Sequence, residues 1–143
     1  MKISSKGRYG LAVLASMAKN EGEGKLVSVT SLAERLEISK IYLEQVFTLL
    51  KRGGLVISIK GANGGYYLAK PPKDITAFDI LSAIETAMFE KTEATISKRD
   101  ESLERSINEN VFNALDKTIE ETLSGISLED IVNKSGEEYM YYL

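Results

Sequence analysis

The stretch from Ser39 to Tyr67, SKIYLEQVFTLLKRGGLVISIKGANGGYY, decides the fold of this 143-residue chain. Ser39 is a good N-cap for the amphipathic helix that follows it, and the Gly53-Gly54 pair ends that helix. The residues after these glycines alternate along a strand pattern, and Asn63-Gly64 is the strongest short signal for a hairpin turn. The stretch therefore predicts one helix followed at once by a two-stranded hairpin.

Two helices precede this stretch. Residues 5–20 repeat apolar side chains every four positions, and residues 29–37 carry a second apolar stripe behind a capping Ser28 or Thr30. Ile38 and Ser39 then form the turn of a helix-turn-helix. The predicted buried face of the third helix consists of Ile41, Leu43, Val46, Phe47, Leu49 and Leu50. Three helices and a hairpin are the elements of a winged helix, so the predicted fold is mainly α with a small β-hairpin.

The hairpin is predicted from a strand over residues 55–60 and a return strand over residues 66–69. In the first strand Leu55, Ile57 and Ile59 share one face, which predicts a half-buried strand. The tip between the strands lacks the Lys-Ser/Thr pair of a phosphate-binding loop, and it leads into a strand where such a loop leads into a helix. Nucleotide binding at the tip is therefore disfavoured.

The third helix and the hairpin supply the candidate DNA contacts. In a helix-turn-helix, the N-terminal residues of the second helix reach base edges in the major groove. The exposed side chains predicted there are Lys40, Tyr42, Glu44 and Gln45. Glycines at the hairpin tip let the backbone approach a phosphate or enter a minor groove. The candidate tip residues are Lys60, Gly61, Asn63, Gly64 and Gly65.

The second half of the chain begins after Pro71-Pro72, which predicts a DNA-binding domain over residues 1–73 and a helical region over residues 74–143. A short helix after Thr76 is followed by a polar loop near residues 90–99 and a long helix over about 100–124. The apolar stripe of this long helix consists of Leu103, Ile107, Val111, Leu115 and Ile119. Pairing with a second copy of the chain would cover the stripe, and packing on its own domain is the alternative. A short last helix and an aromatic tail end the chain.

Charge is divided unevenly between the two halves. Residues 1–73 hold 12 lysines and arginines against 5 acidic residues, a net charge of +7, whereas residues 74–143 hold 6 against 16, a net charge of −10. A basic first half suits a polyanionic partner, although acidic exposed helices alone would give the same division. Lys2, Lys6 and Arg8 cluster at the start of the first helix, where they either meet phosphate or remain a solvated basic end.

Several classes of function are excluded or disfavoured by composition. The chain has no cysteine and no histidine, so it cannot hold a thiolate-bound metal or cluster or activate a nucleophile with imidazole. We therefore expect no enzyme activity, no metal and no cofactor. No run of about 18 apolar residues is present, and the apolar run 9–18 is amphipathic and leads into the next helix. We therefore read it as the first helix of the fold rather than a signal peptide and expect a cytoplasmic protein.

Four separated motifs resemble one bacterial family. They are Met1-Lys-Ile-Ser-Ser-Lys-Gly-Arg-Tyr9, Ile38-Ser-Lys-Ile-Tyr-Leu-Glu-Gln45, Gly54-Leu-Val56 and Lys60-Gly-Ala-Asn-Gly-Gly-Tyr66. Together they resemble the Rrf2 family of winged-helix transcription regulators, and Ile126–Val132 fits the C-terminal end of the family. The resemblance implies a homodimer that places its third helices in the major groove of a palindromic double-stranded operator.

The resemblance also assigns individual roles. It implies that Ser39, Tyr42, Glu44 and Gln45 contact bases or the nearby backbone, and that Ser5, Lys6 and Arg8 lie near the backbone. Lys60 stands in the wing where many members have arginine, which keeps the charge but loses bidentate geometry.

The cysteine-free region before the long helix departs from the iron–sulfur members of the family. Together with the ending Tyr139-Met-Tyr-Tyr-Leu143, it looks most like the CymR-like branch, which represses cysteine and sulfur-uptake genes and takes its signal through cysteine synthase. By that likeness Tyr142 and Leu143 would dock in the partner enzyme. The alternatives are a family member with another stress or metabolic regulon, and a winged helix that serves as a protein-interaction module.

Overall fold

The computed structural model describes residues 2–90 and 100–141, with the backbone alone described at residue 88 and residues 137–141. Its helices and strands follow in the order α1 (Ser5–Asn20), α2 (Val29–Leu36), α3 (Lys40–Arg52), β1 (Val56–Ile59), β2 (Gly65–Leu68), α4 (Ala77–Ile84), α5 (Glu101–Ile107), α6 (Asn113–Ser124) and α7 (Leu128–Tyr141). Short 3-10 turns lie at Pro72–Asp74 and Thr86–Phe89, and a π-helical turn at Asn108–Phe112 joins α5 to α6. The predicted mainly α fold with one small hairpin is confirmed.

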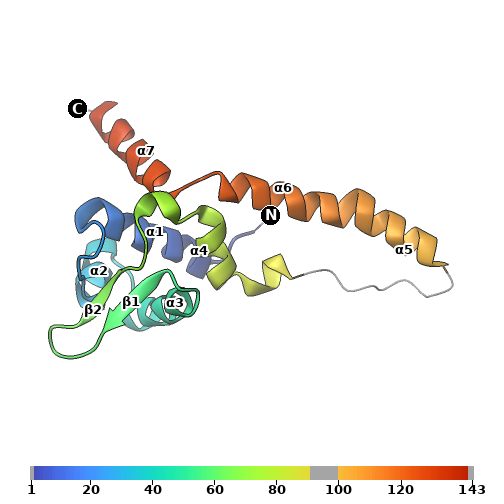
Figure 1. Cartoon of the computed structure of the whole chain (residues 1–143). Coiled ribbons are helices and arrows are strands. Elements are labelled where there is room, and N and C mark those ends of the chain that lie inside the picture. The colour runs from blue at the N-terminus through green and yellow to red at the C-terminus, as the bar shows by residue number, and fades with distance from the viewer. Residues whose placement is uncertain (1, 91–99, 142–143) are drawn as a thin grey trace.

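The arrangement separates the chain into a body and two projecting helical segments. Figure 1 shows α1 to α4 and the hairpin gathered together, with α5 and α6 forming one long rod that extends away from the body. Helix α7 leaves the body on the side opposite to α3 and the hairpin. The predicted polar loop falls on residues 91–99, outside the described part of the chain.

The core is one continuous cluster centred on α1 and α3. Val13, Leu14 and Met17 from α1 lie against Leu43, Val46, Phe47 and Leu50 from α3, and all are fully buried or nearly so. Ile75, Ile80, Ile84 and Leu128 belong to the same cluster. The core therefore continues across the predicted boundary near residue 73.

Close packing of α1 on α4 depends on small residues. A Cβ atom at Gly10 would lie 2.1 Å from Cδ1 of Ile84, and one at Gly7 would lie 2.6 Å from the Glu85 carboxylate. The missing side chains let the two helices approach, which fixes the N-terminal half of α1 beside the end of α4.

The hairpin pairs Val56 with Leu68, Ile57 with Tyr67, Ser58 with Tyr66 and Ile59 with Gly65. Directly opposite residues share a face of the sheet, and the inner face holds the buried Val56 and Leu68. On that face the ring of Tyr66 stacks on Phe47 of α3, with centroids 4.3 Å apart and an angle of 17° between the planes. Because Ser58 is small, it leaves room for the large Tyr66 side chain opposite it.

This packing corrects one sequence-based expectation. Leu55 is buried, but it lies before the strand, and Ile57 and Ile59 are exposed on the outer face at 41% and 47%. The apolar set predicted for one buried face is therefore wrong, because the inner register begins at Val56.

One expectation about element length was wrong. The last helix, α7, is 14 residues long rather than short. Its start is held by Ser127 and Asp130, whose side chains accept hydrogen bonds from each other's backbone N–H groups at 3.0 and 2.9 Å. The hydrogen bond from the Ser127 backbone amide, and with it the Ser127 side chain, lowers the pKa of the Asp130 carboxyl. No helix within the described residues is long and apolar enough to cross a membrane.

Gly65 is the first residue of β2, and it provides a test of how the β1–β2 hairpin, the wing of the winged helix, is attached to the body. Its backbone passes so close to residue 27 that an added Cβ would lie 2.2 Å from the Val27 carbonyl oxygen, beside the paired hydrogen bonds between Val27 and Tyr66, both 2.9 Å long. We expect Gly65→Ala to lower the free energy of unfolding by about 3 kcal/mol, because backbone atoms must separate. Urea unfolding monitored by circular dichroism measures this change.

Gly24→Ala is the matched control. Its φ of +73° carries a conformational cost, but no atom lies within 4 Å of the added Cβ, so we expect a loss of about 1 kcal/mol. Equal losses for the two variants would show that the wing is not held by close approach at Gly65.

Candidate nucleic-acid interface

Side-chain caps and one left-handed residue shape the helix-turn-helix. The Ser31 amide donates to Ser28 Oγ at 3.1 Å at the start of α2, and the Tyr42 amide donates to Ser39 Oγ at 3.4 Å at the start of α3. Between the helices Glu37 has a φ of 54°, and the Ile38 amide returns to the Ala33 carbonyl at 3.0 Å. The turn thus redirects the chain within a few residues and presents the first turn of α3 to solvent.

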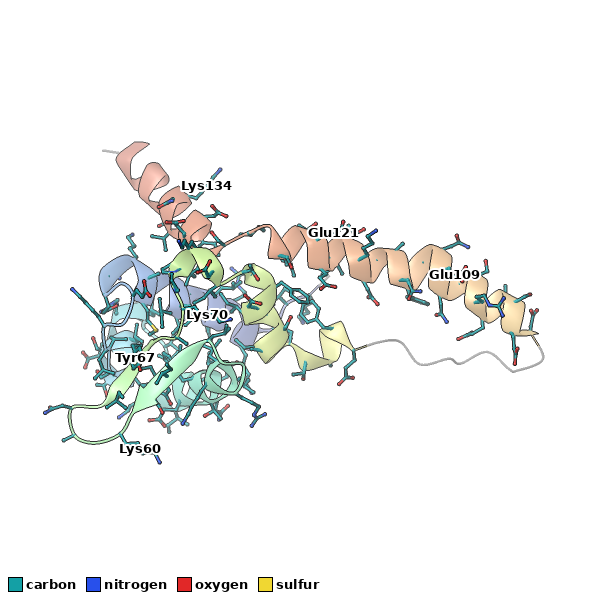
Figure 2. All side chains as sticks on the ribbon, viewed as in Figure 1. Lys60, Tyr67, Lys70, Glu109, Glu121 and Lys134 are labelled. Carbon is teal, nitrogen blue, oxygen red and sulfur yellow. The ribbon has the colours of Figure 1, made fainter. Side chains whose placement is uncertain are left out.

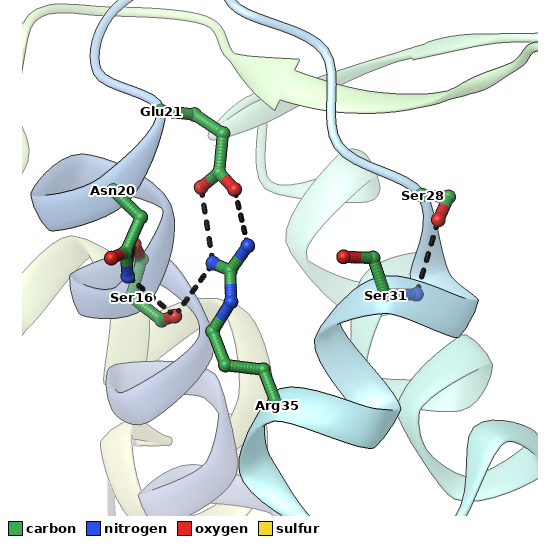
Figure 3. A network of polar contacts seen from close by, with 6 residues as sticks. All are labelled: Ser16, Asn20, Glu21, Ser28, Ser31 and Arg35. Carbon is green, nitrogen blue, oxygen red and sulfur yellow. Dashed lines mark hydrogen bonds and ion pairs between the residues drawn. The ribbon is translucent and has the colours of Figure 1, made fainter.

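A polar network fixes α2 against the end of α1 (Figure 3). Arg35 donates from both terminal nitrogens to the carboxylate of Glu21, and Nη1 also donates to Oγ of the buried Ser16 at 3.1 Å. Asn20 donates its side-chain amide to the Ser16 carbonyl at 2.9 Å. The hydrogen bond with Glu21 raises the pKa of Arg35, and the bidentate pair sets the angle between the two helices.

The outward side of α3 carries most of the predicted contact residues. Ser39, Lys40, Glu44 and Gln45 are all exposed. All four lie within about two helical turns of the N-terminus of α3, outside the buried core. The structure thus brings four of the five predicted α3 residues to one polar surface.

Tyr42 is placed differently from the prediction. Its ring is half-buried and packs edge-on against Tyr9, with centroids 5.4 Å apart. The ammonium of Lys6 lies 5.8 Å from the centre of the same ring. Tyr42 therefore joins α3 to α1 and positions Lys6, and it is less free to reach a base than the sequence suggested.

Ile41 was predicted to be buried, and this is wrong. Its side chain is 72% exposed, the largest exposure among the exposed large apolar side chains in the described part of the chain. With 3.6 residues per turn, Ile41 falls roughly 170° from the centre of the face formed by Leu43, Val46, Phe47 and Leu50. A helical projection alone would have placed it on the outward surface, and this is the residue that our sequence reasoning missed.

The wing closes a groove beside α3. The groove has a volume of about 580 Å³ and runs between the start of α2, the outward side of α3 and the hairpin. Among the described residues that line it, the cationic side chains are Lys40, Lys51 and Lys60, and the one carboxylate is Glu44. A groove lined by three lysines attracts a polyanion such as a phosphate backbone.

The predicted wing residues divide into two kinds. Lys60, Gly61 and Asn63 are exposed at the tip, where Figure 2 shows Lys60 pointing away from the body. Gly64 and Gly65 are half-buried, and the Gly64 amide closes the turn on the Gly61 carbonyl at 3.0 Å. The first group is free to meet a ligand, whereas the second holds the shape of the wing.

The start of α1 is held by a hydrogen bond to Glu85, at the end of α4. Ser4 caps the helix, accepting a hydrogen bond from the Gly7 amide at 3.2 Å, and its own amide donates to Glu85 at 2.8 Å. Ser5 and Arg8 are exposed, and Lys6 is half-buried beside Tyr42. The residues predicted to contact the DNA backbone therefore lie at the start of α1, which is held in place next to α3.

The acidic charges lie on a different part of the molecule. Residues 100–124 hold seven acidic residues against two basic ones, and Figure 2 shows Glu109 and Glu121 on the long rod, far from Lys60 on the wing. A nucleic acid would thus be attracted to the α3 and wing surface and repelled from the rod.

The predicted apolar stripe lies on the long rod, and its side chains remain at least partly exposed. Neither α5, α6 nor the π-helical turn contains a buried residue. Leu103, Val111 and Leu115 are about half exposed, and Ile107 and Ile119 are partly exposed. The predicted tail contacts Tyr142 and Leu143 lie outside the described residues.

The π-helical turn keeps this stripe on one side of the rod. Residues spaced four apart drift by about 40° per step around an α-helix, or about 160° from Leu103 to Ile119. A π-helical turn accommodates one extra residue, which takes back about 100° of that drift. The turn at Asn108–Phe112 lies in the middle of the stripe, where it makes this correction.

Comparisons with known proteins place this geometry in context. A family model, Rrf2, described as an iron-dependent transcriptional regulator, matches residues 3–134. The transcriptional regulator CymR of Bacillus subtilis is 37% identical over 146 aligned positions, covering 100% of both chains. The solved structure of CymR, the global cysteine regulator of B. subtilis, matches with a TM-score of 0.71 at 33% identity, over 94% of this chain and 98% of that one. The structure of T. potens IscR matches with a TM-score of 0.72 at 37% identity, over 99% and 97%.

The donor set of this chain does not fit an iron–sulfur cluster. Iron–sulfur clusters are held chiefly by cysteine thiolates, with histidine in some centres, and the sequence contains neither residue. Across residues 2–90 and 100–141, no three side chains of the metal-binding types come together as a site.

Proposed function

The chain belongs to the Rrf2 family of transcriptional regulators, and from this premise we propose that it is a dimeric repressor of cysteine and sulfur metabolism genes. It binds DNA through α3 and the wing, and it works in the cytoplasm, where bacterial DNA lies. The observation that carries the DNA-binding part is the groove between α3 and the hairpin, with three lysines around a single glutamate.

The docking geometry follows from the dimensions of the interface. The major groove of B-DNA is about 12 Å wide and admits one α-helix. With α3 in that groove, Lys40, Glu44 and Gln45 face base edges. Glutamate accepts from cytosine N4 and glutamine pairs with adenine, so Glu44 and Gln45 supply direct readout.

The remaining cations contact the phosphates. Lys60 and Asn63 at the wing tip meet the backbone or the minor groove next to the site of α3. Ser5, Lys6 and Arg8 at the start of α1 contact phosphates on the other side of α3, and the α1 dipole adds to their attraction.

The long rod formed by α5 and α6 serves as the dimerisation element. Within the described chain none of the side chains of its stripe is buried, although α6 makes some contact with α4. The stripe consists of Leu103, Ile107, Val111, Leu115 and Ile119. An isolated helix of this length with no buried face is unstable in water unless it packs on a partner. Two crossed rods give two α3 helices related by a two-fold axis, and therefore a palindromic operator with half-sites about one helical turn, or a multiple of it, apart.

The cysteine regulon is the finer part of the proposal. It is supported by the end-to-end similarity to CymR and by the absence of cysteine, which leaves no ligands for the cluster of iron–sulfur members. A regulator without its own sensing cofactor needs a partner or a metabolite as its signal. In this proposal cysteine synthase is that partner, and its docking on the tail at Tyr142 and Leu143 supplies the signal.

Two single substitutions separate base readout from backbone attraction. From a random duplex library, we expect Gln45→Ala to select a sequence that differs from the wild-type site at one position per half-site, with a change in base discrimination of about 1–3 kcal/mol. Lys6→Ala should select the same sequence but bind every duplex more weakly, with a shallower dependence of affinity on salt. Sequencing of the selected DNA and titration by gel shift measure both effects.

The contrary result is equally clear. If Gln45→Ala leaves both affinity and selected sequence unchanged, α3 does not read bases as proposed. If the wild-type chain is not retained on DNA-cellulose at low salt, the winged helix acts as a protein-interaction module instead.

The dimerisation proposal predicts a monomer when the stripe receives a charge. Leu115→Asp should raise the dissociation constant of the dimer by about a hundredfold or more, because an unpaired carboxylate would be buried in each subunit. Analytical ultracentrifugation over a range of concentrations measures it. Asn113→Asp adds the same charge to a neighbouring exposed position off the stripe and should dimerise like wild type; equal behaviour of the two variants would place the dimer contact elsewhere.

Deletion of residues 139–143 tests the partner. The truncated chain should lose affinity for cysteine synthase in a titration by calorimetry while keeping its affinity for DNA, because the deletion removes only the last three residues of α7 and the two that follow them and leaves α3 and the hairpin intact. Unchanged affinity for the enzyme would remove the tail from the proposal.

A further inference from the structure

Ile41 is an apolar side chain on an otherwise polar reading surface. It occupies the second position of α3 and is 72% exposed, whereas the other apolar side chains of that helix are buried or half-buried. Its neighbours on the outward side are Lys40 before it and Glu44 and Gln45 one turn later. The exposure is therefore confined to the part of α3 that faces DNA in the proposed function.

Only one kind of apolar group is available at the base edges of the major groove. Adenine, guanine and cytosine present donors and acceptors there, whereas thymine also presents its C5 methyl group. Ile41 has no donor or acceptor in its side chain, so it cannot pair with the other edges. Its β-branched side chain has a restricted χ1 in a helix, so little rotamer freedom is lost on contact.

We propose that Ile41 is a specificity-determining residue that packs on the C5 methyl group of one thymine in each half-site. This inference rests on the proposed function, and it adds a named base to a position that Glu44 and Gln45 do not read. Ile41 discriminates thymine from cytosine by contact area, while its polar neighbours discriminate by hydrogen bonding.

A protein partner fits the same residue less well. Protein-binding surfaces are contiguous apolar patches of several hundred Å², and Ile41 is flanked by Lys40, Glu44 and Gln45, all exposed and polar. The edge of a base pair that contains thymine matches this surface better, since its one methyl group lies among hydrogen-bond donors and acceptors.

Uracil in place of thymine removes the methyl group and leaves the hydrogen-bonding edge unchanged. The experiment first selects the preferred duplex for the wild-type chain from a random library. Each thymine of that duplex is then replaced in turn by deoxyuridine, and the affinities of wild type and Ile41→Ala are measured by fluorescence anisotropy at one fixed salt concentration.

We expect one thymine per half-site at which the replacement weakens wild-type binding by about fourfold, the loss that corresponds to one buried methyl-sized group. Ile41→Ala should bind the unmodified duplex several-fold more weakly and show no further loss at that thymine. Ile41→Val keeps the β-branch and loses one methyl-sized group, so it should fall between the two. Ile126→Ala removes an exposed isoleucine far from α3 in sequence and should behave like wild type.

Two other outcomes overturn the inference in distinguishable ways. If wild type selects a defined sequence but every deoxyuridine affects wild type and Ile41→Ala alike, Ile41 does not contact a methyl group, and the proposed function stands. If wild type selects no sequence at all, the proposed function fails, and the inference fails with it. Circular dichroism of Ile41→Ala and Ile41→Val confirms that both variants are folded before binding is compared.

Discussion

The stacked contact between Phe47 and Tyr66 holds α3 and the hairpin in the relative position on which the proposed DNA-binding surface depends. Phe47 is fully buried and lies on the inner side of α3, and the ring of Tyr66 on the hairpin packs flat against it. The contact joins α3 to the hairpin and, with the paired hydrogen bonds between Val27 and Tyr66, holds the wing beside that helix. Lys40, Ile41, Glu44 and Gln45 face outward because Leu43, Val46, Phe47 and Leu50 must face inward. The groove, its three lysines and the proposed docking on DNA follow from that orientation.

Much of this arrangement was predictable from local signals. Capping residues, paired glycines and Asn63-Gly64 act over a few neighbouring residues, so they placed the helices and the hairpin close to their observed bounds. The stripe of the long helix was predictable as well, since no other element competes for it. The positions of the lysines in the wing and in α3 were predictable from the order of the helices and strands alone.

The errors arose where tertiary packing decides between two faces. Ile57 and Ile59 look like a buried face, but the inner face is chosen by the Tyr66–Phe47 stack, a contact between residues 19 apart in sequence. Tyr42 looks like a reading residue, but Tyr9 of another helix draws its ring inward. Ile41 looks like a core residue by its hydrophobicity, but its phase on α3 places it opposite the buried face. The residue type suggested burial, while the angle showed exposure.

The central claim is that α3 lies in the major groove of two half-sites related by the two-fold axis of a dimer. Methylation interference on the selected duplex tests it most directly, because methyl groups at guanine N7 block the major groove and those at adenine N3 block the minor groove. The account predicts two patches of guanine interference about one helical turn, or a multiple of it, apart, with adenine interference confined to positions beside each patch, where the wing lies. Interference from adenine N3 alone, or none at either position on a duplex that the protein still binds, would contradict it.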